Sequence, residues 1–192
     1  APTIGRVVVA GGSGAVGTLF AEQLQEAGND VVIVDRTTPG PTHRVTHFVR
    51  GDISDPGAEV AAVVRTADAV LLSVPEPVAL AAIGRLVGTV RPDALIVDTS
   101  SVKSTVVPAL HAAATIAGDV EALSLNPMFA PSLGFAGHPV ASVVVRDGRR
   151  GRALHDLIED WGARVVTVTA DQHDRVAAAA QALTHAAVIA FG

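Results

Sequence analysis

The chain has 192 residues, of which 49% are hydrophobic and 17% charged, and its formal net charge is -5. This composition is typical of a packed globular protein with one sizeable core, and it excludes a disordered chain. The negative charge gives no electrostatic reason to expect nucleic acid as a partner. The sequence contains no cysteine, which excludes disulfides and thiolate chemistry, and no metal site is expected. It also lacks an apolar run of the roughly 20 residues that span a bilayer, and its start does not resemble a signal peptide. A soluble cytoplasmic protein is therefore expected.

Short β-branched runs alternate with alanine-rich helical stretches along the whole chain. Several runs are continuously apolar, as in strands that helices cover on both faces. The expected strands are Arg6–Ala10, Asp30–Val34, Thr46–Val49, Ala69–Val74, Ala94–Asp98, Ala122–Leu125, Ala141–Arg146 and Arg164–Thr169. The expected helices are Ala15–Ala27, Pro56–Thr66, Val78–Val90, Ser104–Ala117, Arg149–Trp161 and Asp171–Phe191. The alternation predicts an α/β fold with a doubly wound, mostly parallel sheet.

A glycine-rich segment follows the first apolar strand and opens the first helix. In this context the pattern G-x-G-x-x-G is typical of a loop that binds a dinucleotide. The first glycine permits the tight turn, the second lets the backbone approach a pyrophosphate, and the third lets helix pack on strand. Backbone N–H groups at the helix start would then face the phosphates. The alternative is a turn that merely connects strand to helix. The cofactor-binding residues predicted here are Gly12, Ser13, Gly14, Ala15, Val16 and Gly17.

Two further segments indicate how the dinucleotide would be held. Asp35 closes the second strand, where its carboxylate can bind a ribose 2′-OH and would repel a 2′-phosphate, so NAD is favoured over NADP. Arg36 could pair with that phosphate, which leaves NADP open. Ser73, Val74 and Pro75 are expected to end the fourth strand on the edge where such folds bind ligands, and to contact the nicotinamide side.

The segment Asp98–Lys103 follows the fifth strand and carries small hydroxyl side chains. Such side chains suit a site that admits a nicotinamide ring and a polar substrate, and Ser100 is a predicted cofactor contact. The alternative is local, because Ser101 or Ser104 could cap the helix that follows.

Three segments together resemble the prephenate/arogenate dehydrogenase family. Asp98–Lys103 is similar to its Asp-x-x-Ser-Val-Lys motif, and Asn126–Pro131 to its His-Pro-Met-x-Gly-Pro segment. His173 and Asp174, followed by 181–185, resemble its His-Asp…Gln-Ala-Leu-x-His helix. The resemblance implies a Rossmann-like domain that binds NAD(P) over residues 1–170, and a long helix from 171–192. That helix would lead into a helical dimerisation domain beyond the end of this chain, giving a homodimer.

The family's reaction is the oxidative decarboxylation of a cyclohexadiene: hydride leaves C4 for the nicotinamide and CO₂ leaves C1. By resemblance, Ser101 matches the serine that supports the catalytic histidine and the C4 substituent, and Asn126 matches that histidine itself. Gln181 and His185 match substrate contacts, and His185 is also a candidate catalytic group. His173 is expected to be a solvated residue at the helix start. The chain departs from the family at Ala130, where glycine is usual. The family's substrate-carboxylate arginine would come from the helical domain that is expected beyond this chain.

Asn126 changes what the site can do, since an amide cannot take a proton as a histidine can. A 4-hydroxy substrate needs its proton accepted as hydride departs, and a positioned base typically contributes about 10²–10⁴-fold in rate. A 4-amino group donates electrons more strongly and forms an iminium without simultaneous proton removal. Asn126 therefore favours 4-amino-4-deoxyprephenate as substrate, with 4-aminophenylpyruvate, an arylamine precursor in specialised metabolism, as product.

Two alternatives stay open for the activity. One is an ordinary prephenate or arogenate dehydrogenase of tyrosine biosynthesis that tolerates Asn126. The other is a catalytically silent NAD-binding protein that senses redox state or scaffolds a partner. Retention of Ser101, Gln181 and His185 argues against the silent protein, because it has no need of substrate-side groups.

Overall fold

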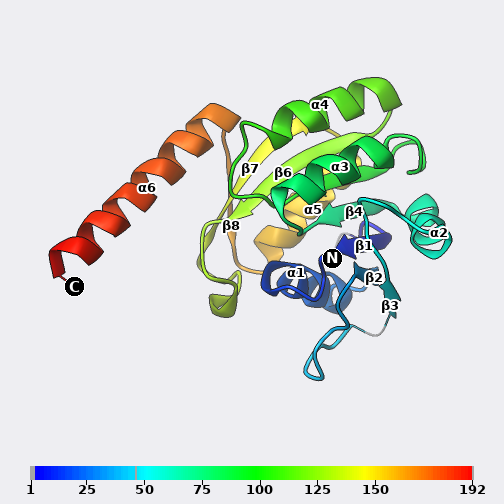
Figure 1. Ribbon diagram of the computed structural model, residues 1–192, viewed down its shortest axis with the longest axis horizontal. Coiled ribbons are helices and arrows are strands. Elements are labelled where there is room, and N and C mark those ends of the chain that lie inside the picture. Colours follow the sequence, from blue (N-terminus) through cyan, green and yellow to red (C-terminus); the bar gives the residue numbers. More distant parts are fainter. Residues whose placement is uncertain (1–2, 46, 192) are drawn as a thin grey trace.

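The computed structural model describes residues 3–45 and 47–191, apart from the side chains of 181 and 184–191. Within these residues one sheet of eight strands is flanked by helices (Figure 1). The strands are β1 (Arg6–Ala10), β2 (Asp30–Asp35), β3 (His47–Arg50), β4 (Ala69–Leu72), β5 (Leu95–Asp98), β6 (Glu121–Pro127), β7 (Pro139–Arg146) and β8 (Arg164–Thr167). The helices are α1 (Ala15–Glu26), α2 (Ala58–Thr66), α3 (Glu76–Leu86), α4 (Val106–Ala117), α5 (Arg149–Asp160) and α6 (Ala170–Phe191), with a 3₁₀ turn, η1, at Pro131–Leu133.

The sheet has the strand order β3-β2-β1-β4-β5-β6-β7-β8. All neighbouring pairs are parallel except β6 and β7, which confirms the predicted doubly wound, mostly parallel arrangement. The chain winds outward from β1 to β3 and then returns to β4 on the other side of β1. The carboxyl ends of β1 and β4 therefore form the topological switch point, where folds of this kind bind ligands.

Two apolar layers hold the helices against the sheet. Side chains alternate along β1, so Val7 and Val9 face one side while Val8 and Ala10 face the other. The first side packs against α1 and α5, and the second against α2, α3 and α4. Because both faces are covered, the central strands carry continuous apolar runs, such as 7–10 in β1, 69–72 in β4 and 95–97 in β5.

The connection after β4 begins two residues earlier than predicted. The strand ends at Leu72, so the prediction that Ser73 and Val74 belong to it is wrong. Ser73 N–H still donates to the Ala10 carbonyl oxygen at 2.8 Å, but Pro75 then becomes the N-cap of α3. A proline restricts the residue before it and offers no N–H to a neighbouring strand, which ends the ladder at this point.

Helix α4 begins at Val106, two residues later than predicted. The N–H groups of Lys103 and Ser104 donate to the carboxylate of Asp174, each at 2.9 Å, and this contact holds the segment outside the helix. The N-cap residue is Thr105. The alternative that Ser101 or Ser104 serves as the cap is therefore wrong.

Candidate active site

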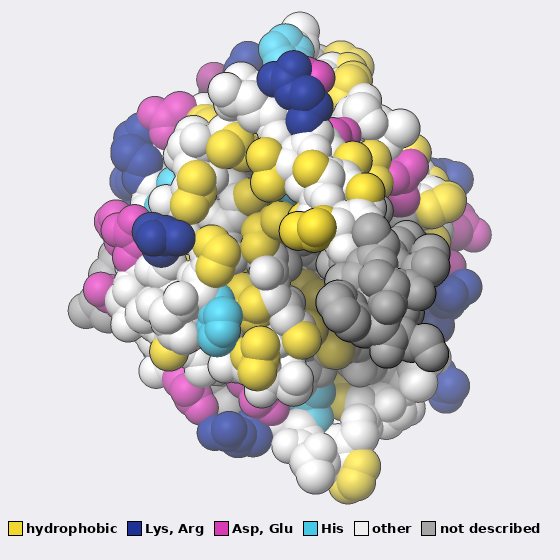
Figure 2. Space-filling view, turned by 90° about the vertical axis from the view of Figure 1, so that its left-hand side faces the viewer, with side chains coloured by type: hydrophobic (Ala, Val, Ile, Leu, Met, Phe, Trp, Pro, Cys, Tyr) yellow, Lys and Arg dark blue, Asp and Glu magenta, His cyan; other side chains and the backbone are white. Residues whose placement is uncertain are grey.

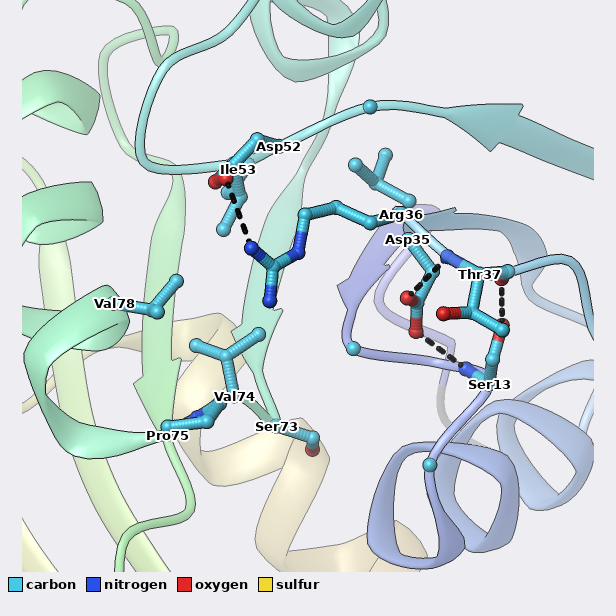
Figure 3. Close-up of a pocket in the computed structure, with 14 residues that line it drawn as sticks. Ser13, Asp35, Arg36, Thr37, Asp52, Ile53, Ser73, Val74, Pro75 and Val78 are labelled. Atoms are coloured by element: carbon cyan, nitrogen blue, oxygen red, sulfur yellow. Dashed lines mark hydrogen bonds and ion pairs between the residues drawn. The ribbon is translucent and has the colours of Figure 1, made fainter.

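A cleft of 330 Å³ opens at the switch point between β1 and β4 (Figure 3). Its walls come from the glycine segment, the end of β2 and the connections after β3 and β4. Seven of the predicted cofactor residues line it: Ser13, Gly14, Asp35, Arg36, Ser73, Val74 and Pro75. The rest of the lining was not predicted from the sequence to bind the cofactor, and it consists of Gly11, Val34, Thr37, Gly51, Asp52, Ile53 and Val78.

Glycine is present at two positions of this segment for different structural reasons. A Cβ on Gly17 would lie 2.2 Å from the Gly11 carbonyl oxygen, so only glycine lets α1 pack against the turn. A Cβ on Gly14 would meet that same oxygen at 3.3 Å and nothing else within 4 Å, at the wall of the cleft. Gly14 therefore adds no side chain to the wall of the cleft. The first hydrogen bond of α1 runs from the N–H group of Thr18 to the carbonyl oxygen of Gly14. The N–H groups of 15–17 come before this bond and have no acceptor within the helix, so this helix start can bind an anion.

Asp35 and Arg36 face different parts of the cleft. The Asp35 carboxylate accepts hydrogen bonds from the backbone N–H groups of Ser13 and Thr37, both at 3.0 Å. Each oxygen keeps a further lone pair, so the carboxylate can also accept a hydroxyl. Arg36 is exposed and extends towards Asp52, with 3.8 Å between Nη1 and Oδ2 (Figure 3). The other predicted residues lie outside the lining, since Gly12 packs on Ile33 and residues 15–17 belong to α1.

A second polar cluster lies beside the cleft, at the ends of β5 and β6. Thr99 Oγ1 lies 3.2 Å from Ser73 Oγ and so connects the two. Asp98 and Lys103 form a fully buried ion pair with 3.5 Å between Oδ2 and Nζ. The carboxylate also accepts from the hydroxyls of Ser100 and Ser124, at 2.7 and 2.8 Å. Predicted as a cofactor contact, Ser100 is turned towards Asp98.

Lys103 ties the loop after β5 to β6. Its ammonium donates to the carbonyl oxygens of Ser100 and, at 2.7 Å, Leu125, the residue before Asn126. Burial lowers the pKa of Lys103 to about 8, although the charge of Asp98 raises it in part. A buried cation with all three donors engaged fixes the geometry around it. Lys103 is the only lysine of the chain, and it positions the backbone that carries Asn126.

Asp174 joins the start of α6 to the same loop. Its two oxygens accept the N–H groups of Lys103 and Ser104, and Oδ1 also lies 2.8 Å from Nδ1 of His173. Burial raises the pKa of Asp174, but the hydrogen bonds from His173 and the two backbone N–H groups outweigh it and bring the pKa to about 2. Asp174 is therefore an ionised acceptor at neutral pH.

The prediction that His173 is solvated is wrong, because the residue is only 3% exposed. The docking of Asp174 turns its neighbour inward, where His173 Nε2 lies 2.9 Å from Nδ2 of Asn126. The same Nδ2 lies 3.2 Å from the sulfur of Met128. Asn126 is half-buried in β6, opposite Ala141 of β7, and so stands at the carboxyl edge beside the cleft.

The remaining predicted substrate residues make no hydrogen bond to Asn126 among the side chains that the structure describes. Ser101 is exposed, and no hydrogen bond links it to Asn126 in the part of the chain that the structure describes. Gln181 and His185 belong to α6, but their side chains lie outside the described residues. Asp98, Lys103, His173 and Asp174 belong to the motifs recognised in the sequence, but their side chains were not predicted to be part of the site.

An apolar hollow of 280 Å³ adjoins His173. Figure 2 looks at the side of the molecule from which α6 projects, and hydrophobic side chains gather there. The hollow is lined by Met128, Pro139, Ala141, Val166, Val168, Gln172, His173 and Val176. The imidazole thus separates an apolar surface from the polar cluster at Asn126.

The strand order and the cleft at its switch point define a dinucleotide-binding domain of the doubly wound, Rossmann type. The family model described as prephenate dehydrogenase, nucleotide-binding domain, matches residues 20–141. The chain belongs to this family, as the three motifs predicted. Among the described residues, no helix combines the length and apolar character needed to cross a membrane.

The chain is similar to two relatives and to one solved structure of this family. It is 50% identical over 188 residues to a 4-amino-4-deoxyprephenate dehydrogenase of Streptomyces pristinaespiralis, covering 98% of this chain and 62% of that protein. It is 32% identical over 194 residues to a T-protein of Enterobacter agglomerans, covering 100% of this chain and 45% of that protein. The crystal structure of prephenate dehydrogenase from Aquifex aeolicus shares the fold, with a TM-score of 0.72 and 21% identity over 96% of this chain and 68% of that one. The chain therefore spans about half to two thirds of the length of these proteins.

Proposed function

We propose that the chain is the NAD-binding part of an oxidoreductase that decarboxylates a prephenate-type cyclohexadiene, with 4-amino-4-deoxyprephenate as substrate and 4-aminophenylpyruvate as product. The observation that carries the proposal is Asn126, an amide at the carboxyl edge beside the nucleotide cleft, where the family motif has histidine. The 50% identity to an enzyme named for this substrate supports it. Homodimer formation through a further helical domain stays a prediction.

The residues of the cleft fit a dinucleotide. The helix start at 15–17 offers N–H groups to a pyrophosphate, and Gly14 leaves room for it. Asp35 has a free lone pair on each oxygen for a ribose hydroxyl and would repel a 2′-phosphate. Arg36, the residue that could accept that phosphate, extends towards the carboxylate of Asp52. These features favour NAD over NADP. Bound NAD would supply the hydride acceptor.

Asn126 would bind the substituent on C4 of the substrate. Its amide has no proton-accepting group comparable to imidazole, so it cannot relieve a hydroxyl of its proton. A neutral amino substituent supplies electrons from the lone pair of its nitrogen and keeps its N–H groups, which donate hydrogen bonds to the amide oxygen. A hydrogen bond to a group that is gaining positive charge is stronger than one between neutral groups. Ser101, Gln181 and His185 are the further substrate residues proposed from the family motifs.

Steady-state kinetics on the natural full-length protein test the proposal. We expect kcat/KM for the amino substrate to exceed that for prephenate by at least about tenfold, roughly one hydrogen bond to a charged group. Asn126→His should lower this ratio, because imidazole restores a base for the hydroxyl. Asn126→Leu is the control of similar size, and it should lose turnover of both substrates. A wild-type preference for prephenate would instead support an ordinary prephenate or arogenate dehydrogenase.

A catalytically silent protein makes a different prediction in the same assay. It would bind NAD, as measured by calorimetry, yet form no NADH with either cyclohexadiene. Turnover of either substrate by wild type excludes it.

A further inference from the structure

We propose that His173 and Asp174 are positioning residues that fix the side-chain amide of Asn126 with its carbonyl oxygen, rather than its NH₂ group, turned to the substrate. The orientation makes the site an acceptor of hydrogen bonds and so selects a nitrogen substituent. This inference rests on the proposed function and identifies the residues that set its substrate preference.

The first step is the state of Asp174. The carboxylate is held by two backbone N–H groups of the loop after β5, at 2.9 Å each, and these bonds keep it ionised. An ionised carboxylate can only accept hydrogen bonds. The short contact of 2.8 Å between its Oδ1 and Nδ1 of His173 therefore requires the proton on Nδ1.

The second step is the other ring nitrogen. A neutral imidazole that carries its proton on Nδ1 has a lone pair on Nε2. Nδ2 of Asn126 lies 2.9 Å from that nitrogen and donates to it. The second hydrogen of the same NH₂ group points to the sulfur of Met128, a weak acceptor at 3.2 Å. Both hydrogens of the amide are thus engaged by the protein.

The third step is the cost of the opposite orientation. A flipped amide would place Oδ1 against the lone pairs of His173 Nε2 and the Met128 sulfur, and both hydrogen bonds would be lost. The choice between nitrogen and oxygen is thus determined by the hydrogen-bond network. Oδ1 of Asn126 has no hydrogen-bond partner among the described residues and is left for a ligand.

The consequence is a site with a defined polarity. An amine on C4 presents N–H groups and gains positive charge as the ring loses hydride, so an acceptor oxygen stabilises it. An NH₂ group in the same place would repel that charge. The hydroxyl of prephenate benefits less, because the amide oxygen cannot remove its proton. Residues that never touch the substrate thus set the preference through Asn126.

Three variants of the natural full-length protein test this inference through the ratio of kcat/KM for 4-amino-4-deoxyprephenate to that for prephenate. His173→Leu removes the acceptor, and we expect the ratio to fall about tenfold, the effect of one hydrogen bond to a charged group. His173→Gln keeps an acceptor oxygen near the Nε2 position and should stay within about threefold of wild type. His111→Leu, at an exposed histidine of α4, is the matched control and should leave the ratio unchanged.

Nitrogen NMR of the same protein with ¹⁵N-labelled histidine gives a readout that does not depend on turnover. We expect His173 to carry its proton on Nδ1 and none on Nε2, with the signals assigned by their loss in His173→Gln. A proton on Nε2 overturns the inference, as does an unchanged ratio in His173→Leu when wild type prefers the amino substrate. A wild-type preference for prephenate refutes the proposed function instead, whatever the tautomer.

Discussion

The two halves of the site are built in different ways. The nucleotide cleft is lined by short stretches of chain, chiefly Gly11, Ser13 and Gly14 and the run 34–37. The proposed substrate side is assembled from three distant segments, 98–104, 124–128 and 173–174, which one buried ion pair and several hydrogen bonds hold together. The first half depends on the absence of side chains at its glycines. The second depends on the contacts that Lys103 and Asp174 make with the loop after β5. Substitutions should therefore damage the two halves by different routes.

The largest expected effect is on stability and comes from the substrate side. Lys103→Met leaves Asp98 buried without its cation and removes the bonds to Ser100 and Leu125. Removing one partner of a buried ion pair typically costs about 3–5 kcal/mol. Urea unfolding measures the free energy of unfolding. Arg44→Met removes an exposed ion pair with Glu26 and should cost less than about 1 kcal/mol. Similar losses in both variants would contradict the distinction.

Two glycine variants separate packing from ligand binding in the cofactor half. Gly17→Ala places a Cβ 2.2 Å from a backbone oxygen and should lower the free energy of unfolding by about 1–3 kcal/mol. Gly14→Val puts its bulk at the wall of the cleft, so we expect NAD affinity to fall at least about tenfold with little change in stability. Calorimetry with NAD and thermal unfolding check both effects. Unchanged NAD affinity in Gly14→Val would argue against the pyrophosphate position.

The ionisation of Asp174 should make the free energy of unfolding depend on pH in the acid range. Its folded pKa of about 2 lies below the ordinary 3.8, so its stabilisation is fully present above pH 3.8 and is lost as the pH falls through about 2. Wild type should lose about 1 kcal/mol more than Asp174→Asn over this range, after allowance for partial exposure. Unfolding in urea at pH 7, 4 and 2.5 measures the difference. Parallel curves for the two proteins would contradict the assigned contacts.

The smallest expected effect concerns Arg36. Its side chain is 72% exposed, and its Nη1 lies 3.8 Å from Oδ2 of Asp52, so this ion pair contributes little to stability. Arg36→Ala should change the Kd for NAD by less than about threefold. Fluorescence titration with NAD and NADP measures both affinities. A large loss of NADP affinity alone would show that Arg36 pairs with a 2′-phosphate.

The sequence predicted the half of the site whose geometry is local. The strand Arg6–Ala10, the glycine segment and Asp35 follow from apolar runs and fixed spacings, because the chemistry lies within a few residues of the chain. His173 was predicted wrongly since a histidine beside an aspartate at a helix start is usually solvated. Its partner Asn126 is 47 residues away, and no local pattern reports that contact. The single lysine of the chain, in a polar loop between apolar elements, was the available signal for the buried pair.

The central claim is that Asn126 presents an acceptor to an amino substituent, and one ratio tests it most directly. Wild-type natural full-length protein is assayed for NADH formation with 4-amino-4-deoxyprephenate and with prephenate under identical conditions. The account predicts that kcat/KM for the amino substrate is higher by at least about tenfold. Equal values, or a higher value for prephenate, would contradict it.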